Sequence, residues 1–151
     1  MLHTLDHIVV YASLKRVFEL AADVERWPVL LPHYRYVRRL GASLSDGPAA
    51  YAMGATRSGI PVRWSSTQRC EREALRIAYH HIEGVTRGMD VEWRFEAVEG
   101  GVVRVTIEHR LERGWPLVAS PLGRALVGEL FVRNVAQRTL RGIKRAAEGG
   151  R

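Results

Sequence analysis

Hydrophobic and polar residues alternate through most of the middle of the chain, with a period of two that is typical of half-buried antiparallel strands. Val91, Trp93 and Phe95 share one face of such a strand, and residues 103–111 repeat the pattern after a Glu-Gly-Gly turn. The same period predicts further strands at residues 34–40, 51–55, 62–69 and 75–81. The middle of the chain is therefore predicted to form an antiparallel sheet.

Apolar residues change to helical spacing on both sides of this strand-rich region. Residues 14–32 predict short helices, and a long helix is predicted to run to Gly149 and Gly150. One side of that helix carries an apolar stripe formed by Val132, Val135, Ala136, Thr139 and Ile143. Little else in the sequence can cover the apolar face of the sheet. We therefore expect an α+β fold in which the curved sheet and the late helix enclose a small-molecule pocket.

The side chains on the predicted inner face of the sheet are apolar or aromatic with polar tips, and none of them is acidic. They are Tyr51, Met53, Trp64, Ser66, Gln68, Tyr79, His81, Trp93 and His109. The strand carboxylates and arginines fall on the other face, where a solvated cross-strand lattice is expected. A face without acids is poorly suited to a metal or a cationic ligand, and it suits a neutral, partly aromatic or oxygenated molecule.

Length and composition favour a single domain over residues 1–151, since nothing in the chain resembles a linker. Cys70 is alone, so no intrachain disulfide can form, and the N-terminus lacks the apolar run of a secretion signal, which predicts a cytoplasmic location. The longest apolar stretch, residues 115–132, is interrupted by Pro116, Pro121, Arg124 and Glu129. It is not expected to span a membrane, but it is apolar enough to touch a membrane surface. Its second half, residues 122–131, is apolar enough to form the interface of a homodimer.

The formal net charge of +7 makes a nucleic acid one partner to consider. Nearly all of the positive charge is arginine, spread among acidic residues without a basic cluster or a zinc-finger or helix-turn-helix pattern. An arginine-rich nucleic-acid-binding or partner-binding domain is therefore the weakest of three hypotheses. No metal-ligand spacing and no glycine-rich phosphate loop occurs, so neither a metal nor another cofactor is expected.

The segment Asp23, Val24, Glu25, Arg26, Trp27, Pro28, continued by residues 31–34, resembles the START and Bet v 1-like (SRPBCC) superfamily. Within it, the chain is similar to the polyketide cyclase/dehydrases and the coenzyme Q-binding proteins, the latter also through residues 92–95, Phe131 and Val135. The resemblance implies a helix-grip fold, in which two short helices follow the first strand and a curved antiparallel sheet wraps around a long C-terminal helix. It implies a hydrophobic small-molecule ligand and is more specific for fold than for chemistry.

One position departs from the aromatase/cyclases that the chain resembles. In those proteins a strand tryptophan is followed four residues later by an arginine that points into the pocket, where it can polarise substrate carbonyls. Here Gln68 stands four residues after Trp64, and Arg69 follows it. Either a bulge turns Arg69 inward or the cationic anchor is absent.

The candidate catalytic residues are His81, His109 and Tyr79, because histidine can accept and donate a proton during enolisation and dehydration. A histidine on an apolar face is, however, more often a hydrogen-bonded core residue. The candidate ligand-binding residues are Tyr51, Met53, Trp64, Gln68, Arg69, Trp93, Phe131 and Val135. Binding of a quinone, lipid or polyketide-like molecule is the favoured hypothesis, ahead of cyclase or dehydratase catalysis in the same cavity, and whether the chain is an enzyme stays open.

Overall fold

The computed structural model describes residues 2–41, 48–57, 59–84, 86–112 and 132–149. A seven-stranded antiparallel sheet has the strand order β1-β7-β6-β5-β4-β3-β2. The strands are β1 (Leu2–Val10), β2 (Tyr34–Leu40), β3 (Ala49–Arg57), β4 (Ile60–Glu71), β5 (Arg76–Gly84), β6 (Asp90–Val98) and β7 (Val102–Leu111). Strands β2 to β7 form a meander, and β1 pairs with β7 at its far edge. Every strand that the period of two predicted is present.

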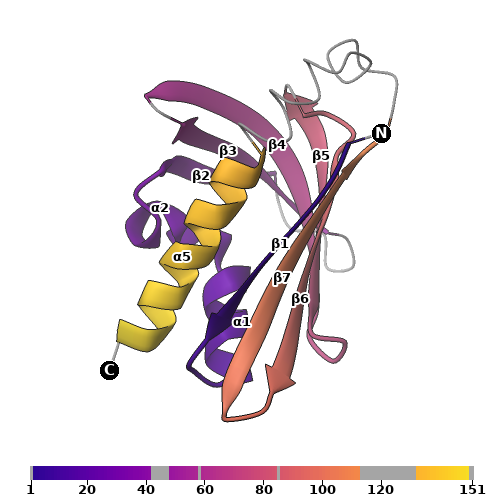
Figure 1. The fold of residues 1–151 in the computed structure, drawn as a ribbon. Helices are drawn as coiled ribbons and strands as arrows, with labels where there is room; N and C mark the ends of the chain where they lie inside the picture. The colour runs from indigo at the N-terminus through magenta and orange to yellow at the C-terminus, as the bar shows by residue number, and fades with distance from the viewer. Residues whose placement is uncertain (1, 42–47, 58, 85, 113–131, 150–151) are drawn as a thin grey trace.

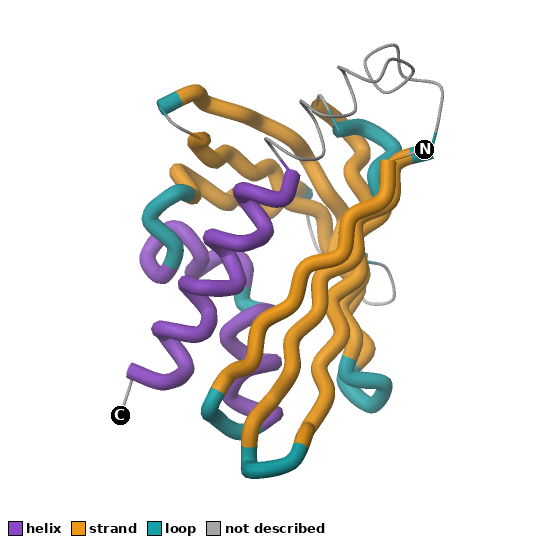
Figure 2. Tube along the Cα trace, in the orientation of Figure 1, coloured by secondary structure: helices purple, strands orange, loops and turns teal. Residues whose placement is uncertain are grey.

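The helices lie together on the concave side of this sheet. After β1 come α1 (Leu14–Ala22), the 3-10 turn η1 (Val24–Arg26) and α2 (Trp27–Leu30), and the chain's long late helix is α5 (Arg133–Gly149). Figure 1 shows α5 lying across the hollow of the curved sheet with α1 and α2 beside it, and Figure 2 shows the helices on one side of the strands. This arrangement confirms the α+β class and the helix-grip fold.

Hydrogen bonds at the helix ends fix α1 against α5. The Ser13 side chain accepts a hydrogen bond from the backbone N–H of Arg16 and so caps the start of α1. The Arg16 side chain donates to the carbonyl oxygens of Ala147 (2.9 Å) and Ala146 (3.0 Å) at the end of α5. The last carbonyls of a helix lack intrahelical partners, so Arg16 satisfies two of them and ties the two helices together.

The outer face of the sheet carries the expected lattice of charged side chains. Glu108 Oε1 accepts from Arg94 Nη1 at 2.9 Å, and its Oε2 accepts from Arg110 Nη2 at 2.9 Å and contacts His3 Nε2 at 2.6 Å. The hydrogen bonds from Arg94 and Arg110 lower the pKa of Glu108 to about 2. The charges of Arg94 and Arg110 are therefore paired with a carboxylate on this face.

The expectation that no acid faces inward is wrong, because Asp6 on β1 does. Leu2, Thr4 and Asp6 are buried along one side of the strand, and Asp6 is 1% exposed. Its Oδ1 accepts a hydrogen bond from Gln137 Nε2 at 2.7 Å and pairs with Arg133 Nε at 3.3 Å, both on α5. The sequence hides this orientation because the inward and outward sets of β1 both mix polar with apolar residues.

The predicted membrane contact and the predicted homodimer concern residues that lie mostly outside the described ranges. The apolar stretch before Val132, which includes Phe131, is not described, so the expected membrane contact and homodimer stay predictions. None of the helices in the described ranges combines the length and the apolar character that crossing a membrane requires.

A close approach at Gly84 is needed for β4 and β5 to meet beside Trp64. Gly84 has φ +104°, and a Cβ there would lie 2.6 Å from the Arg63 carbonyl oxygen and 2.9 Å from the Trp64 Cα. We expect Gly84→Ala to lower the free energy of unfolding by about 2–4 kcal/mol, since backbone has to move. Gly100→Ala is the control in urea denaturation, because it also has positive φ but meets nothing within 4 Å; equal losses for the two variants would contradict the steric argument.

Candidate functional site

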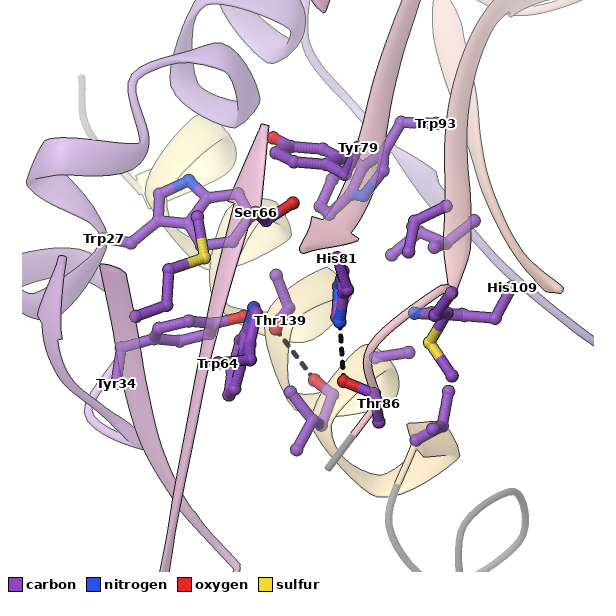
Figure 3. Close-up of a pocket in the computed structure, with 17 residues that line it drawn as sticks. Trp27, Tyr34, Trp64, Ser66, Tyr79, His81, Thr86, Trp93, His109 and Thr139 are labelled. Carbon is purple, nitrogen blue, oxygen red and sulfur yellow. Dashed lines mark hydrogen bonds between the residues drawn. The ribbon is translucent and has the colours of Figure 1, made fainter. Parts of the chain in front are cut away.

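A cavity lies between the inner face of the sheet and α5, and Figure 3 shows the side chains around it. Its lining comprises Trp27, Tyr34, Met53, Trp64, Ser66, Tyr79, His81, Thr86, Met89, Val91, Trp93, Ile107, His109, Val132, Val135, Ala136 and Thr139. The centres of water-sized molecules can occupy about 70 Å³ of it. That space is small beside the roughly 300–1,000 Å³ of pockets for drug-sized ligands, so the large aromatic side chains narrow the cavity as well as line it.

Neighbouring rings form a continuous chain of contacts in which all members except Phe18 and Phe95 line the cavity, and those that do are its aromatic wall. Their centroids are spaced 5.0 Å for Phe18–Phe95, 6.2 Å for Phe95–Trp93, 5.7 Å for Trp93–Trp27, 5.1 Å for Trp27–Tyr34, 5.9 Å for Tyr34–Trp64 and 5.8 Å for Trp64–His81. The Trp64 and His81 rings are stacked at an interplanar angle of 9°. Such contacts stabilise the rings beyond their burial alone, and the wall presents flat apolar surfaces to whatever enters.

The cavity brings together most of the residues that the sequence singled out. Met53, Trp64, Tyr79, His81, Trp93, His109 and Val135 all line it. Tyr51 is buried but does not line it, and its ring lies 5.9 Å from the Arg39 guanidinium carbon. The predicted residue Phe131 lies outside the described residues. The role of each residue in binding or catalysis stays a prediction.

Gln68, and not Arg69, turns toward the interior. Gln68 Nε2 donates to the Ala22 carbonyl oxygen at 2.9 Å and to the Tyr79 hydroxyl at 3.1 Å, and Gln68 lines a second, solvent-facing hollow beside α1 instead of the cavity. A register shift does occur in β4 at Ser65 and Ser66, but Arg69 remains exposed. The prediction that Arg69 lines the cavity is therefore wrong, and the described lining contains no arginine or lysine.

Two histidines on the inner face of the sheet line the cavity, His81 on β5 and His109 on β7, and Figure 3 labels both. The His81 Nδ1 lies 2.6 Å from the Thr86 hydroxyl, and burial, with smaller repulsion from His109 and His80, lowers the pKa of His81 to about 3. Burial also lowers the pKa of His109 to about 4, against an opposing attraction from Asp6. Both rings are therefore neutral at pH 7, the form that accepts a proton or a hydrogen bond.

A third histidine, which sequence reasoning did not single out, joins a hydrogen-bond network beside the cavity. The Thr139 hydroxyl donates to the Val135 carbonyl oxygen at 2.7 Å, so its oxygen must accept from His33 Nε2, 3.0 Å away. Thr139 also forms a hydrogen bond with the hydroxyl of Tyr34. Burial raises the pKa of Tyr34 and lowers the pKa of His33 to about 4. The only sequence signal was a threonine in the apolar stripe of the late helix.

Two buried polar atoms in the lining have no hydrogen-bond partner: Trp27 Nε1 and His109 Nδ1. An unsatisfied buried polar group costs roughly 1–3 kcal/mol, so these two atoms mark the places where a partner from outside the chain is worth most. A resident metal is not indicated, since no cluster of three or more metal-ligating side chains occurs within the described ranges.

Comparison with known proteins gives matches along nearly the whole chain. The model of a family described as polyketide cyclase / dehydrase and lipid transport matches residues 10–140. A Streptomyces halstedii protein provisionally assigned as a polyketide cyclase is 29% identical over 102 residues, which are 67% of this chain and 94% of that protein.

Solved structures show the same fold at low sequence identity. The Zhui aromatase/cyclase of Streptomyces sp. R1128 superposes with a TM-score of 0.81 at 19% identity, over 97% of this chain and 93% of that one. A START superfamily protein of Mycobacterium smegmatis gives a TM-score of 0.78 at 14% identity, over 100% of both chains. At these identities the likeness speaks for the fold alone.

Proposed function

The chain belongs to the polyketide cyclase/dehydrase and lipid transport family, and from this premise we propose that it binds one hydrophobic, oxygen-bearing small molecule between the sheet and α5. Tryptophan, tyrosine, methionine and aliphatic side chains make up most of the cavity lining, so burial of apolar area supplies most of the affinity. Quinones and polyketide-like molecules fit this description better than plain hydrocarbon chains.

The observation that carries the proposal is the buried and unpartnered Trp27 Nε1 in the cavity lining. An indole N–H can only donate, so Trp27 requires an acceptor such as a carbonyl or ether oxygen. Trp27 and His109, whose neutral ring can accept a hydrogen bond, lie on opposite sides of the cavity (Figure 3), which favours a ligand with polar groups near both ends. The absence of arginine and lysine from the described lining favours a neutral ligand.

Replacement of Trp27 by phenylalanine tests this reading, because it removes the N–H and keeps an aromatic ring. The probes are 1-tetralone and tetralin, which share a carbon skeleton and differ by one carbonyl oxygen. We expect the unaltered protein to prefer 1-tetralone, and Trp27→Phe to lose about 2–10-fold in affinity for the ketone, the worth of one neutral hydrogen bond.

Isothermal titration calorimetry gives the four dissociation constants that this comparison needs. Tetralin affinity is the internal control, since it reports the packing change and not the lost donor. Equal affinities for the two probes in the unaltered protein, or an unchanged preference in Trp27→Phe, would remove the assigned donor. Native mass spectrometry of the purified protein would identify the class of any co-purified molecule.

A second candidate function, cyclase or dehydratase catalysis, is favoured by the two neutral histidines. His81 on β5 and His109 on β7 line the same cavity, so one substrate carbon can lie within reach of both. The missing arginine weighs against it, because no cation is available in the described lining to polarise a carbonyl. A linear poly-β-ketone thioester is the test substrate, and equal turnover by the His81→Asn, His109→Asn double variant would exclude histidine catalysis.

A further inference from the structure

The inward side of the β1–β7 edge carries a small group of polar residues behind the cavity. In the antiparallel register Thr4 lies opposite His109 and Asp6 opposite Ile107, which places Asp6 diagonally across the ladder from His109. Residues that are directly opposite share a face, and diagonal neighbours have Cβ atoms roughly 7–8 Å apart or closer. Asp6, Thr4 and His109 therefore face the interior side by side.

Each of these residues has a buried polar atom without a hydrogen-bond partner. The atoms are Asp6 Oδ2, Thr4 Oγ1 and His109 Nδ1. The Asp6 side chain is 0% exposed, and its other oxygen is already held by Arg133 and Gln137. The carboxylate is thus fixed by α5 through one oxygen, and the second oxygen is buried without a partner.

We propose that Asp6 is the positioning residue of His109. One hydroxyl bridge donates to Asp6 Oδ2 and accepts from His109 Nδ1–H. It is supplied by a water, or by Thr4 Oγ1 after its side chain rotates, since Thr4 Oγ1 bonds neither atom in the structure. A hydroxyl or a water can make both bonds at once, and since Asp6 Oδ2 and His109 Nδ1 make no direct bond in the structure, one bridging group would satisfy both atoms. The bridge holds His109 in the Nδ1–H tautomer, with Nε2 as the acceptor on the cavity side.

The proposal makes the two cavity histidines unequal. His109 has a carboxylate on β1, Arg133 on α5 beyond that carboxylate and His81 on β5, which lines the same cavity, while Glu108 and Arg110 lie on the outer face. His81 bonds the Thr86 hydroxyl and stacks on Trp64. The attraction of Asp6 works against the lowered pKa of His109, and no carboxylate does so for His81.

The consequence rests on the proposed function, because a bound ligand has to supply the proton. When a ligand hydroxyl gives up its proton to His109 Nε2, the O–H electron pair stays on the ligand oxygen. When a C–H flanked by carbonyls does so, the C–H electron pair is delocalised onto a carbonyl oxygen as an enolate. The imidazolium then lies beside an anion that is already in place, as it does in Ser-His-Asp sites. His81 has no such partner, so His109 is the proton acceptor of the pair.

Ring ¹⁵N chemical shifts of the ligand-free protein at pH 7.5 test the positioning role directly, since they report the tautomer of each histidine. We expect His109 to be mainly Nδ1–H, and Asp6→Asn to shift its tautomer ratio by about tenfold or more toward Nε2–H, the worth of a charge-assisted hydrogen bond. The control is Gln137→Met, which removes a bond to Oδ1 and keeps the anion, so it should leave the ratio unchanged.

Further variants separate the possible bridges and guard against misfolding. Loss of the Nδ1–H preference in Thr4→Val assigns the bridge to the threonine hydroxyl, and retention assigns it to water. Should Asp6→Asn fail to fold, Asp6→Glu keeps the charge and should keep the tautomer. A folded Asp6→Asn with the tautomer ratio of the unaltered protein, or a wild-type His109 that is mainly Nε2–H, would overturn the proposal. Failure of 1-tetralone to bind would instead count against the proposed function alone.

Discussion

Acid should unfold this protein between about pH 6 and pH 4, a higher pH than protonation of its carboxylates alone would require. Burial lowers the pKa of His33 to about 4, of His81 to about 3 and of His109 to about 4, from an ordinary value of 6.5. Below pH 6.5 the unfolded chain therefore binds protons that the folded chain cannot. Stability is complete above pH 6.5 and falls as the pH drops toward these folded-state pKa values.

The size of the effect follows from proton linkage. Each histidine that is protonated only in the unfolded chain lowers the free energy of unfolding by about 1.4 kcal/mol for each unit by which the pH falls. Three such histidines together give a slope of about 4 kcal/mol per pH unit. Domains are usually stable by about 5–15 kcal/mol, so one to two pH units remove much of the total. Glu108, whose pKa is lowered to about 2, adds a further loss only below about pH 4.5.

Urea denaturation at half-unit steps from pH 7.5 to pH 4.5 measures this slope. Replacement of any one buried histidine by asparagine should reduce the slope by about a third, whatever it does to stability at pH 7.5. His80→Asn is the control, because His80 is exposed on the outer face, where it pairs with Asp90 at 2.7 Å. A free energy of unfolding that stays constant from pH 7 to pH 5 would show that the three rings take up protons in the folded state.

Strand parity was readable from the sequence where one side of a strand meets solvent and the other meets the core. Val91, Trp93 and Phe95 alternate with charged residues, and their burial follows that pattern. On β1 the argument fails, because the outward set includes apolar residues and the inward set includes Thr4 and Asp6. A buried carboxylate contradicts hydrophobic patterning until its partners on α5 are known, and those partners lie more than a hundred residues away.

The polar part of the site was harder to predict than its aromatic part. Trp64, Trp93 and His109 could be placed by strand period alone, whereas His33 and Tyr34 follow a proline in a connection where the period begins afresh. Their position depends on Thr139, and thus on how α5 lies against the sheet. Sequence also could not decide whether large inward side chains fill a core or line a cavity, because both uses require the same residue types.

Trp93→Ala distinguishes these two uses of the aromatic wall. Trp93 is 3% exposed and lies between Trp27 and Phe95, with ring centroids at 5.7 Å and 6.2 Å. We expect the variant to lose about 3–5 kcal/mol of unfolding free energy, the usual range for removal of a buried tryptophan side chain. Thermal or urea denaturation of the variant beside the unaltered protein measures the loss.

Indole then reports whether the space left by Trp93 persists. If the rings around it are held in place by their neighbours, the void joins the cavity, stays apolar and binds indole, as rigid engineered cavities bind small aromatics. At ten times its dissociation constant indole should restore about 1.4 kcal/mol of unfolding free energy to the variant and much less to the unaltered protein.

Leu140→Ala, at a fully buried position away from the cavity lining, is the matched control, since its void is too small for a bicyclic ring. No rescue of Trp93→Ala would mean that the wall collapses when one ring is lost, and the narrow cavity would then open only by displacement of its aromatic side chains when a ligand enters.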